Sequence, residues 1–155
     1  MHTIWKSIWL ILAFTFVLSA QQVEITAMEM SATQMSKEIH FIGSAKVVQG
    51  DDWILADEIV VYFDENNQTK SYQAKGHVRF ELKEGGSHYK GKAQKVTFYP
   101  QKSLYKLQGN AVIDDLLENR HIVAERITLD VKTGKASVVG KKKRPVKFIF
   151  DTEQK

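Results

Sequence analysis

The sequence lacks cysteine altogether and contains only two prolines, Pro100 and Pro145. Without cysteine the chain cannot form a disulfide bond, use a thiol nucleophile, or carry a lipid on a cysteine next to a signal sequence. It also lacks Gly/Ser-rich linkers, heptad repeats and low-complexity tracts, and its 155 residues fit one domain of ordinary size. Its stability must therefore come from side-chain packing and sheet hydrogen bonds.

A strong charge of either sign is absent as well. The chain has 22 Lys and Arg against 18 Asp and Glu, a formal net charge of +4, which argues against a dedicated nucleic-acid-binding protein. There is no Ser-His-Asp grouping and no glycine-rich phosphate loop, and no metal-ligand spacing joins His40, His77, His88 and His121. We therefore predict no catalytic residues, no metal site and no cofactor.

The first 20 residues have the features of an export signal. Lys6 precedes an apolar run over residues 8–18, and small residues follow at 19–20. The run is shorter than the about 20 apolar residues that a membrane-spanning helix needs. The sequence therefore predicts a cleaved signal peptide at residues 1–20 and a single domain at residues 21–155. The alternative is an uncleaved membrane anchor.

Two short phrases recur along the rest of the chain. One is a glycine in an apolar frame: Gly43, Gly76 and Gly109 are each 33 residues apart, and Gly140 follows after 31. The other places an alanine three residues before a large apolar residue, and its alanines are Ala27, Ala56, Ala93 and Ala124. The regular alternation of two phrases over four units predicts repeated β-hairpins.

Between these phrases, apolar and polar residues alternate at the period of half-buried strands. Counting along the alternation places the repeated glycines on the apolar face, where a glycine usually marks a bend. Two apolar residues three apart, such as Ala56 and Ile59, face the same way only if a bulge lies between them. The pattern predicts a sheet bent over its own apolar face, as a bent sandwich or incompletely closed barrel. Residues 31–38 are the best candidate helix, and turns are expected at residues 64–67, 84–87, 100–103 and 132–135.

These features together resemble the OstA-like family of lipopolysaccharide transport proteins, and in size its LptA-like periplasmic members. The stretch from Gly50 to Ile59, GDDWILADEI, is the most family-like, and the resemblance extends over residues 23–150. It implies an all-β fold, a bent and incompletely closed antiparallel β-jellyroll. It also implies a periplasmic location and lipopolysaccharide acyl chains held in an apolar groove. Finally, it implies end-to-end stacking with itself and with LptC-like inner-membrane and LptD-like outer-membrane proteins of the same fold.

The inward-facing apolar residues of the predicted strands are the candidate lipid-binding site. Their alternative role is that of an ordinary hydrophobic core. The candidates are Phe41, Val47, Ile59, Val61, Phe63, Val78, Phe80, Leu82, Val96, Phe98, Leu107, Ile113, Ile127, Leu129 and Phe148. The same inward column also contains Ile39, Ala45, Leu55, Tyr72, Tyr105 and Phe150.

We therefore expect a non-enzymatic carrier or bridge that passes lipopolysaccharide from the inner to the outer membrane. The alternatives are a β-solenoid adaptor that stacks through its edges without binding lipid, and an inner-membrane-anchored, LptC-like component. Residues 23–30 and 146–151 are expected to form the two ends of the sheet. The basic run Lys141-Lys142-Lys143-Arg144, just before the second end, is either a solvated, charged edge or a contact for lipid phosphates. Asn67 lies in a turn sequence that resembles a bacterial N-glycosylation acceptor.

Overall fold

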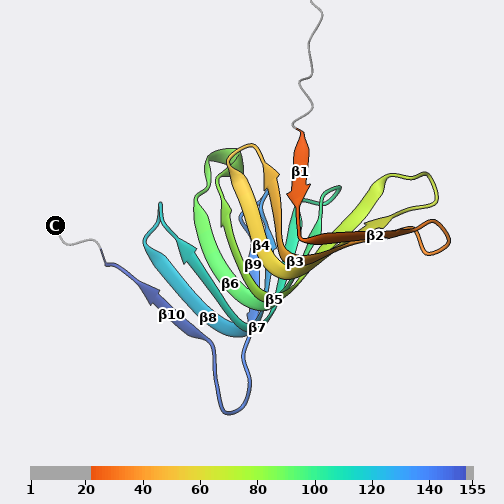
Figure 1. Cartoon of the computed structure of the whole chain (residues 1–155). Coiled ribbons are helices and arrows are strands. Elements are labelled where there is room, and N and C mark those ends of the chain that lie inside the picture. The colour runs from red at the N-terminus through yellow and green to blue at the C-terminus, as the bar shows by residue number, and fades with distance from the viewer. Residues whose placement is uncertain (1–21, 153–155) are drawn as a thin grey trace, which may run out of the picture.

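The computed structural model describes residues 22–152, and this part of the chain forms one bent sheet of ten strands (Figure 1). The signal peptide expected at residues 1–20 lies outside the described residues. No helix within residues 22–152 is long and apolar enough to cross a membrane. The elements are β1 (Val23–Thr26), β2 (Glu29–Thr33), β3 (Glu38–Gln49), β4 (Asp52–Phe63), β5 (Thr69–Leu82), the 3-10 turn η1 (Glu84–Gly86), β6 (Tyr89–Tyr99), β7 (Leu104–Asp115), β8 (Arg120–Asp130), β9 (Ala136–Val139) and β10 (Lys147–Phe150).

The helix expected at residues 31–38 is wrong, whereas the expected turns are confirmed. The segment contains the end of β2 and the turn into β3, and β2 pairs with β3 from Glu29 opposite Ile42 to Thr33 opposite Glu38. The antiparallel partner satisfies the backbone N–H and C=O groups of β2, and this outweighs a weak local preference for helix.

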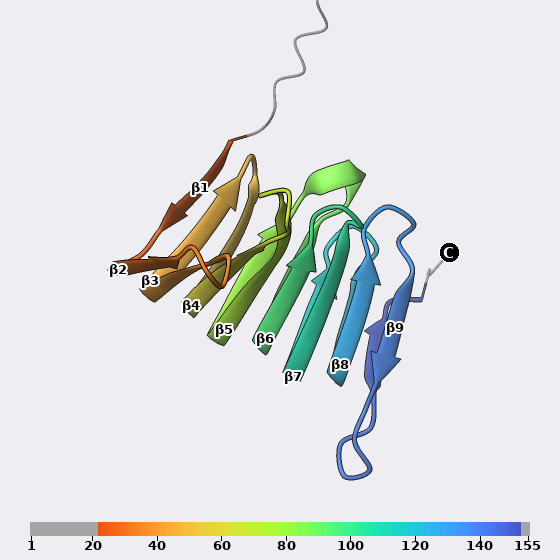
Figure 2. The same ribbon diagram turned by 90° about the vertical axis from the view of Figure 1, so that its right-hand side faces the viewer.

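The long strands β3 to β8 form a meander in which they follow one another in chain order (Figure 2). Each of them runs through a bend that divides the sheet into two arms (Figure 1). The first arm holds β1, β10 and the halves of β3–β8 between them, such as residues 46–49 of β3. The second arm holds β2, β9 and the other halves, such as residues 38–42 of β3. At each end of the sheet two short strands thus replace one long strand, and the chain changes arms between them.

The bend arises from irregular pairing at the same level in every strand pair from β3 to β8. In alternate strands the irregularity contains two consecutive residues with positive φ: Gly43-Ser44 (φ 87° and 45°), Gly76-His77 (80° and 49°) and Gly109-Asn110 (82° and 46°). Only glycine reaches this region without steric strain. The 33-residue spacing of the glycines is therefore the spacing of these bulges, two strands apart.

The bulge expected between alanine and the following apolar residue is confirmed. Ala56 and Ile59 are both buried in the same hydrophobic cluster, and the register between β4 and β5 shifts between Leu55 and Glu58. Because of this shift, the residues before Ala56 that face inwards are the even-numbered ones, whereas those after the shift are odd-numbered. The inward placement expected for Leu55 is therefore wrong: Leu55 is 37% exposed on the outer face, and Ile54 takes the inward position.

The apolar-face position expected for the repeated glycines is wrong as well. A Cβ added to Gly76 would lie 3.0 Å from the Cβ of Asp57, and one added to Gly109 would lie 2.8 Å from the Cβ of Gln94. Asp57 and Gln94 are exposed side chains outside the bend. Their closeness shows that the glycines make room for an outer neighbour. On the inner side of the bend the small residues are alanines instead: Ala45, Ala56, Ala93, Ala111 and Ala124.

Replacing Gly76 by alanine should lower the free energy of unfolding by about 1–3 kcal/mol, because strain at positive φ adds to the contact with Asp57. Gly134→Ala is the matched control, since Gly134 has φ 71° but no atom lies within 4 Å of an added Cβ. It should lose about 1 kcal/mol from the backbone alone. Urea denaturation measures both values. Equal losses in the two variants would show that the outer contact is not restrictive.

The outer face of the second arm carries a histidine held between two carboxylates. Nδ1 of His40 lies 2.9 Å from a carboxylate oxygen of Glu58, and Nε2 lies 3.0 Å from one of Glu38. The hydrogen bond to Glu58, followed by that to Glu38, raises the pKa of His40 above its ordinary 6.5. When protonated, the ring donates both bonds and ties β3 to β4.

This pair of bonds predicts a pH-dependent contribution to stability. Because the folded-state pKa of His40 is raised, the contribution is complete below pH 6.5 and is lost as the pH rises through the folded-state value. The difference in the free energy of unfolding between the wild type and His40→Gln should be larger at about pH 5.5 than at about pH 9. Denaturant titrations at both pH values measure it, and a constant difference would contradict the role given to His40.

Candidate functional site

The inner surfaces of the two arms meet over one continuous hydrophobic cluster. Its most deeply buried large side chains are Phe80, Ile59, Leu82, Leu107 and Ile127. They come from β4, β5, β7 and β8, so both arms and most of the meander contribute. Burying each such side chain stabilises the fold by roughly 1.5–3 kcal/mol. The cluster joins the two arms from the bend to the ends of the strands, where Leu82 and Leu129 are also buried.

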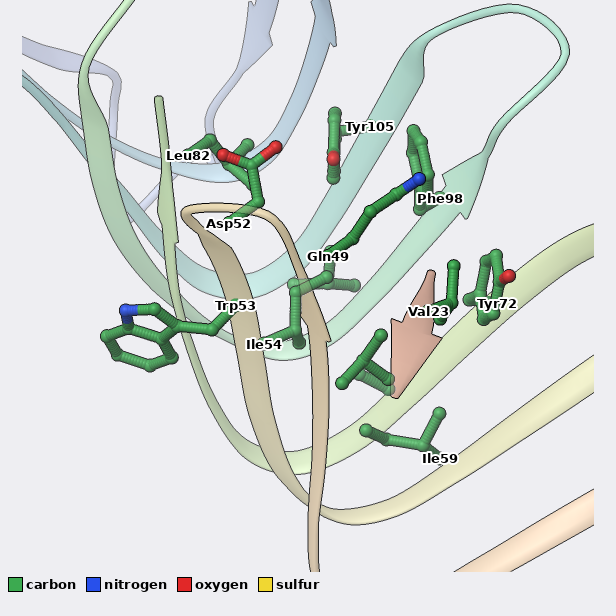
Figure 3. Close-up of a pocket in the computed structure, with 13 residues that line it drawn as sticks. Val23, Gln49, Asp52, Trp53, Ile54, Ile59, Tyr72, Leu82, Phe98 and Tyr105 are labelled. Carbon is green, nitrogen blue, oxygen red and sulfur yellow. The ribbon is translucent and has the colours of Figure 1, made fainter. Parts of the chain in front are cut away.

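A pocket lies between the arms near β1, with about 500 Å³ of empty space that is partly open to solvent (Figure 3). Both arms line it with apolar side chains. The first arm contributes Val23, Val47, Ile54 and Leu82, and the second arm contributes Ile59, Tyr72, Ala74, Val96, Phe98 and Tyr105. The pocket is therefore one accessible part of the inner surface.

One wall of the pocket is a row of stacked aromatic rings. Tyr72, Phe98 and Tyr105 lie directly opposite one another on β5, β6 and β7. The ring centroids are 6.1 Å apart for Tyr72 and Phe98 and 4.3 Å apart for Phe98 and Tyr105, and the planes are nearly parallel. The row gives the second arm a flat apolar surface across three strands.

Apart from the hydroxyl groups of Tyr72 and Tyr105, the polar groups of the pocket lie where it reaches the free end of the first arm. Gln49 ends β3 and Asp52 begins β4, and Figure 3 shows Gln49 extending towards Phe98. Asp52 accepts a hydrogen bond of 2.6 Å from the backbone N–H of Lys83, which fixes its carboxylate at this position. The pocket therefore has an apolar interior and a polar rim, an arrangement suited to an amphiphile.

Trp53 borders the same pocket, but its indole points away from the other lining side chains (Figure 3). The Nζ of Lys46 lies 5.8 Å from the centre of the Trp53 ring. The contact is of the cation–π type and lies on the outer face of the first arm. Trp53 thus stabilises the arm from outside and adds no group to the interior of the pocket.

The inner surface continues unevenly towards β10. Asp115 is buried at the end of β7, where its carboxylate accepts a hydrogen bond of 2.6 Å from Arg120. This bond raises the pKa of the Arg120 guanidinium and keeps it charged. Beyond it, the rings of Phe148 and Phe150 stack at 5.2 Å and are about half exposed. The apolar surface is therefore open at the C-terminal end of the sheet.

Most of the candidate residues lie on the inner surface, at different depths. The buried cluster contains Ile59, Val78, Phe80, Leu82, Val96, Leu107, Ile113, Ile127 and Leu129, and Phe41, Val47 and Phe98 pack against it half-buried. Val61 is buried outside this cluster, Phe63 lies near the free end of the second arm, and Phe148 is half exposed on β10. The pocket brings together Val47, Ile59, Leu82, Val96 and Phe98.

Several pocket residues were missed by sequence reasoning, namely Val23, Gln49, Asp52, Trp53 and Ile54. Ile54 could have been found by counting back two residues from Ala56. No sequence pattern indicated that Val23, Gln49 and Asp52 line the pocket, because their positions depend on which short strand joins which arm. Among residues 22–152, no three His, Asp or Glu side chains are placed to hold a metal ion.

The comparisons with known proteins agree with this geometry. The family model for the LptA/LptD N-terminal domain, an LPS transport protein, matches residues 24–135. LptH, the LptA-homologous periplasmic component of the lipopolysaccharide transport device of Pseudomonas aeruginosa, is similar in structure. Its TM-score is 0.74 at 13% identity, over 85% of this chain and 96% of that chain. No curated protein matches the sequence significantly.

The structural likeness confirms the expected bent, incompletely closed antiparallel β-jellyroll, since at this low identity it bears on the fold alone. The family match is independent of it and covers well over half of the 155 residues. The chain belongs to the LptA/LptD N-terminal-domain family of lipopolysaccharide transport proteins.

Proposed function

We propose that this protein is a periplasmic carrier that holds lipopolysaccharide by its acyl chains in the space between the two arms. The observation that carries the proposal is the pocket with a mainly apolar interior, an aromatic wall and the polar side chains of Gln49 and Asp52 at its rim. Each methylene group moved from water into such a surface contributes about 0.8 kcal/mol. An acyl chain can therefore be held without any specific polar contact.

The same surface suits transfer as well as binding. Apolar contact is non-directional, so an acyl chain can move from one strand to the next without breaking a specific bond. The inner surface is continuous across the strands from β4 to β8, and sugar hydroxyl groups would stay at the rim near Gln49 and Asp52. Deeper entry requires the arms to separate, because Phe80 and Leu82 are fully buried when the arms are closed.

Stacking of copies would extend this surface. Within residues 22–152, β1 and β2 at one end of the sheet pair only with β3, and β9 and β10 at the other end pair only with β8. Unpaired strand edges readily accept another strand. Phe148 faces the inner side at one end and Met30 at the other, and both are at least half exposed. Head-to-tail pairing with another copy, or with LptC-like and LptD-like proteins, would join the inner surfaces into one path.

Photocrosslinking in living cells tests the groove directly. A photoreactive residue in place of Phe98 should capture lipopolysaccharide, and one in place of Thr97 should not, because neighbouring side chains on β6 face opposite sides. Phe98 is the better position than Phe80, since it is half-buried and lines the pocket. Equal capture at both positions, or none at either, would favour the adaptor that stacks without binding lipid.

A charge placed in the pocket gives a second readout. Val47→Lys puts an ammonium group on the lining and should reduce lipopolysaccharide capture by about tenfold or more, because acyl chains cannot satisfy it. Val48→Lys is the matched control, since Val48 faces outwards opposite Trp53 on β4. Capture at Phe98 is compared in the two variants. Similar losses would place the lipid outside this pocket.

Deletion of residues 145–155 tests assembly, because it removes β10 and leaves β1 to β9 in place. The truncated protein should lose concentration-dependent oligomers in light-scattering measurements and still capture lipopolysaccharide. Deletion of residues 152–155 is the control, since this segment follows β10. Oligomers that survive the longer deletion would move the contact away from β10.

A further inference from the structure

The outer side of the bend carries two pairs of like charge between β5 and β6. Lys75 lies directly opposite Lys95, and Arg79 lies directly opposite Lys92, one pair on each side of the register shift. Like charges in directly opposite positions destabilise a sheet. These four side chains therefore lower the stability of the fold, which suggests that they serve in binding another molecule.

One carboxylate, that of Glu58, lies directly opposite Lys75 on β4, but it forms no ion pair with the lysine. Asp57 is bonded to His77 at 2.8 Å, and Glu58 is bonded to His40 at 2.9 Å. In the part of the chain that the structure describes, the side chains of Lys75, Arg79, Lys92 and Lys95 form no ion pair or hydrogen bond. Their charge is available to an external anion.

The basic run lies at the same bend, in the turn that connects β9 to β10. A backbone bridge joins Lys141 to Arg144. The Nζ of Lys141 lies 3.3 Å from Glu125, and the guanidinium of Arg144 donates a bond of 2.9 Å to the side chain of Asn110. These contacts fix the base of the turn to the outer bend. Lys142 and Lys143 remain exposed at its tip, which protrudes beyond the bend (Figure 1).

These positions define one surface, which we call the cationic ridge. It follows the outer side of the bend from β5 across β8 to the protruding turn. Its members are Lys75, Arg79, Lys92, Lys95, Arg126, Lys142 and Lys143. Strands are spaced about 4.8 Å apart, so the part from β5 to β8 alone spans about 14 Å.

The cationic ridge and the pocket lie on opposite faces of the sheet. The inward neighbours of the ridge residues, such as Ala74, Val78 and Ala93, belong to the buried cluster. A lipid held between the arms is therefore separated from the ridge by the sheet itself. The anion that the ridge attracts is a different one from the lipid in the groove.

We propose that the cationic ridge docks the protein on an anionic phospholipid surface. Protein partners are usually held through buried aromatic or large apolar anchors. The ridge instead consists of cations, all exposed except the half-buried Lys95, beside polar side chains such as Gln94 and Asn110. Each Lys or Arg near an anionic bilayer raises the affinity about fivefold without further complementarity. The convex bend can approach a flat surface, and the free ends of the two arms then point away from the bilayer (Figure 1).

Vesicle binding of the purified protein tests the proposal. The wild type should bind vesicles that contain phosphatidylglycerol, should not bind pure phosphatidylcholine vesicles, and should be released by salt. The variant Lys75→Gln/Arg79→Gln/Lys92→Gln/Lys95→Gln should bind at least about tenfold more weakly. Its midpoint of unfolding in urea should be unchanged or higher, because the like-charge pairs are gone. A merely structural role for these residues would lower it.

The matched control removes four cations from the free end of the second arm: Lys70→Gln/Lys102→Gln/Lys132→Gln/Lys135→Gln. It has the same net charge as the ridge variant and should bind vesicles within about threefold of the wild type. Lipopolysaccharide capture at Phe98 should be unchanged in the ridge variant, which separates docking from the groove. The proposal is overturned if the wild type does not prefer anionic vesicles, or if both variants lose binding equally. Retention of an acidic protein without vesicle binding would overturn it in favour of a protein partner.

Discussion

The pair of positive-φ residues that interrupts every second long strand is the constraint on which the rest of the structure depends. At Gly43, Gly76 and Gly109 the chain turns without leaving its sheet, so one meander supplies both arms. The small side chains on the inner side of the turn are alanines, which let the arms approach over a shared cluster. The glycines act on the other side, where a Cβ would collide with Asp57 or Gln94. The outer side of the bend thus requires glycine and the inner side requires alanine. This explains why the sequence contains two separate recurring phrases, one with each residue.

At the ends of the sheet the chain passes from one arm to the other through a break between two short strands, whereas each long strand in the middle passes through a bulge. Between β1 and β2, and between β9 and β10, it leaves one arm and enters the other as a separate short strand. Short strands with one neighbour have fewer cross-strand contacts than the long strands, and local stability falls with contact density. The ends can therefore exchange partners at lower cost than the meander can. The proposed head-to-tail stacking would require this property.

The sequence predicted the features that depend on local pattern. It did not predict which way side chains face beyond a bulge, or which strands pair. Alternation identified the strands, and Ala56 with Ile59 correctly required a bulge. The alternation could not be carried through that bulge, which is why Leu55 was placed inwards and the glycines were assigned to the apolar face. Residues 31–38 read as a helix because the pairing of β2 with β3 is not a local property. Most of the pocket's apolar lining was predictable, whereas Val23, Gln49 and Asp52 join it only through the arrangement of the arms.

The bend also links the two proposed sites mechanically. Lys75 and Arg79 lie on the outer side of β5, before and after the bulge, and their partners Lys95 and Lys92 lie likewise on β6. Opening the arms straightens these strands and brings the cations on either side of the bulge closer together, so like-charge repulsion favours the closed arms. An anionic surface on the ridge screens that repulsion and lowers the cost of opening. Under the two proposals, a docked protein would therefore open its groove more readily than a free one, and the closed state would protect the groove during transit.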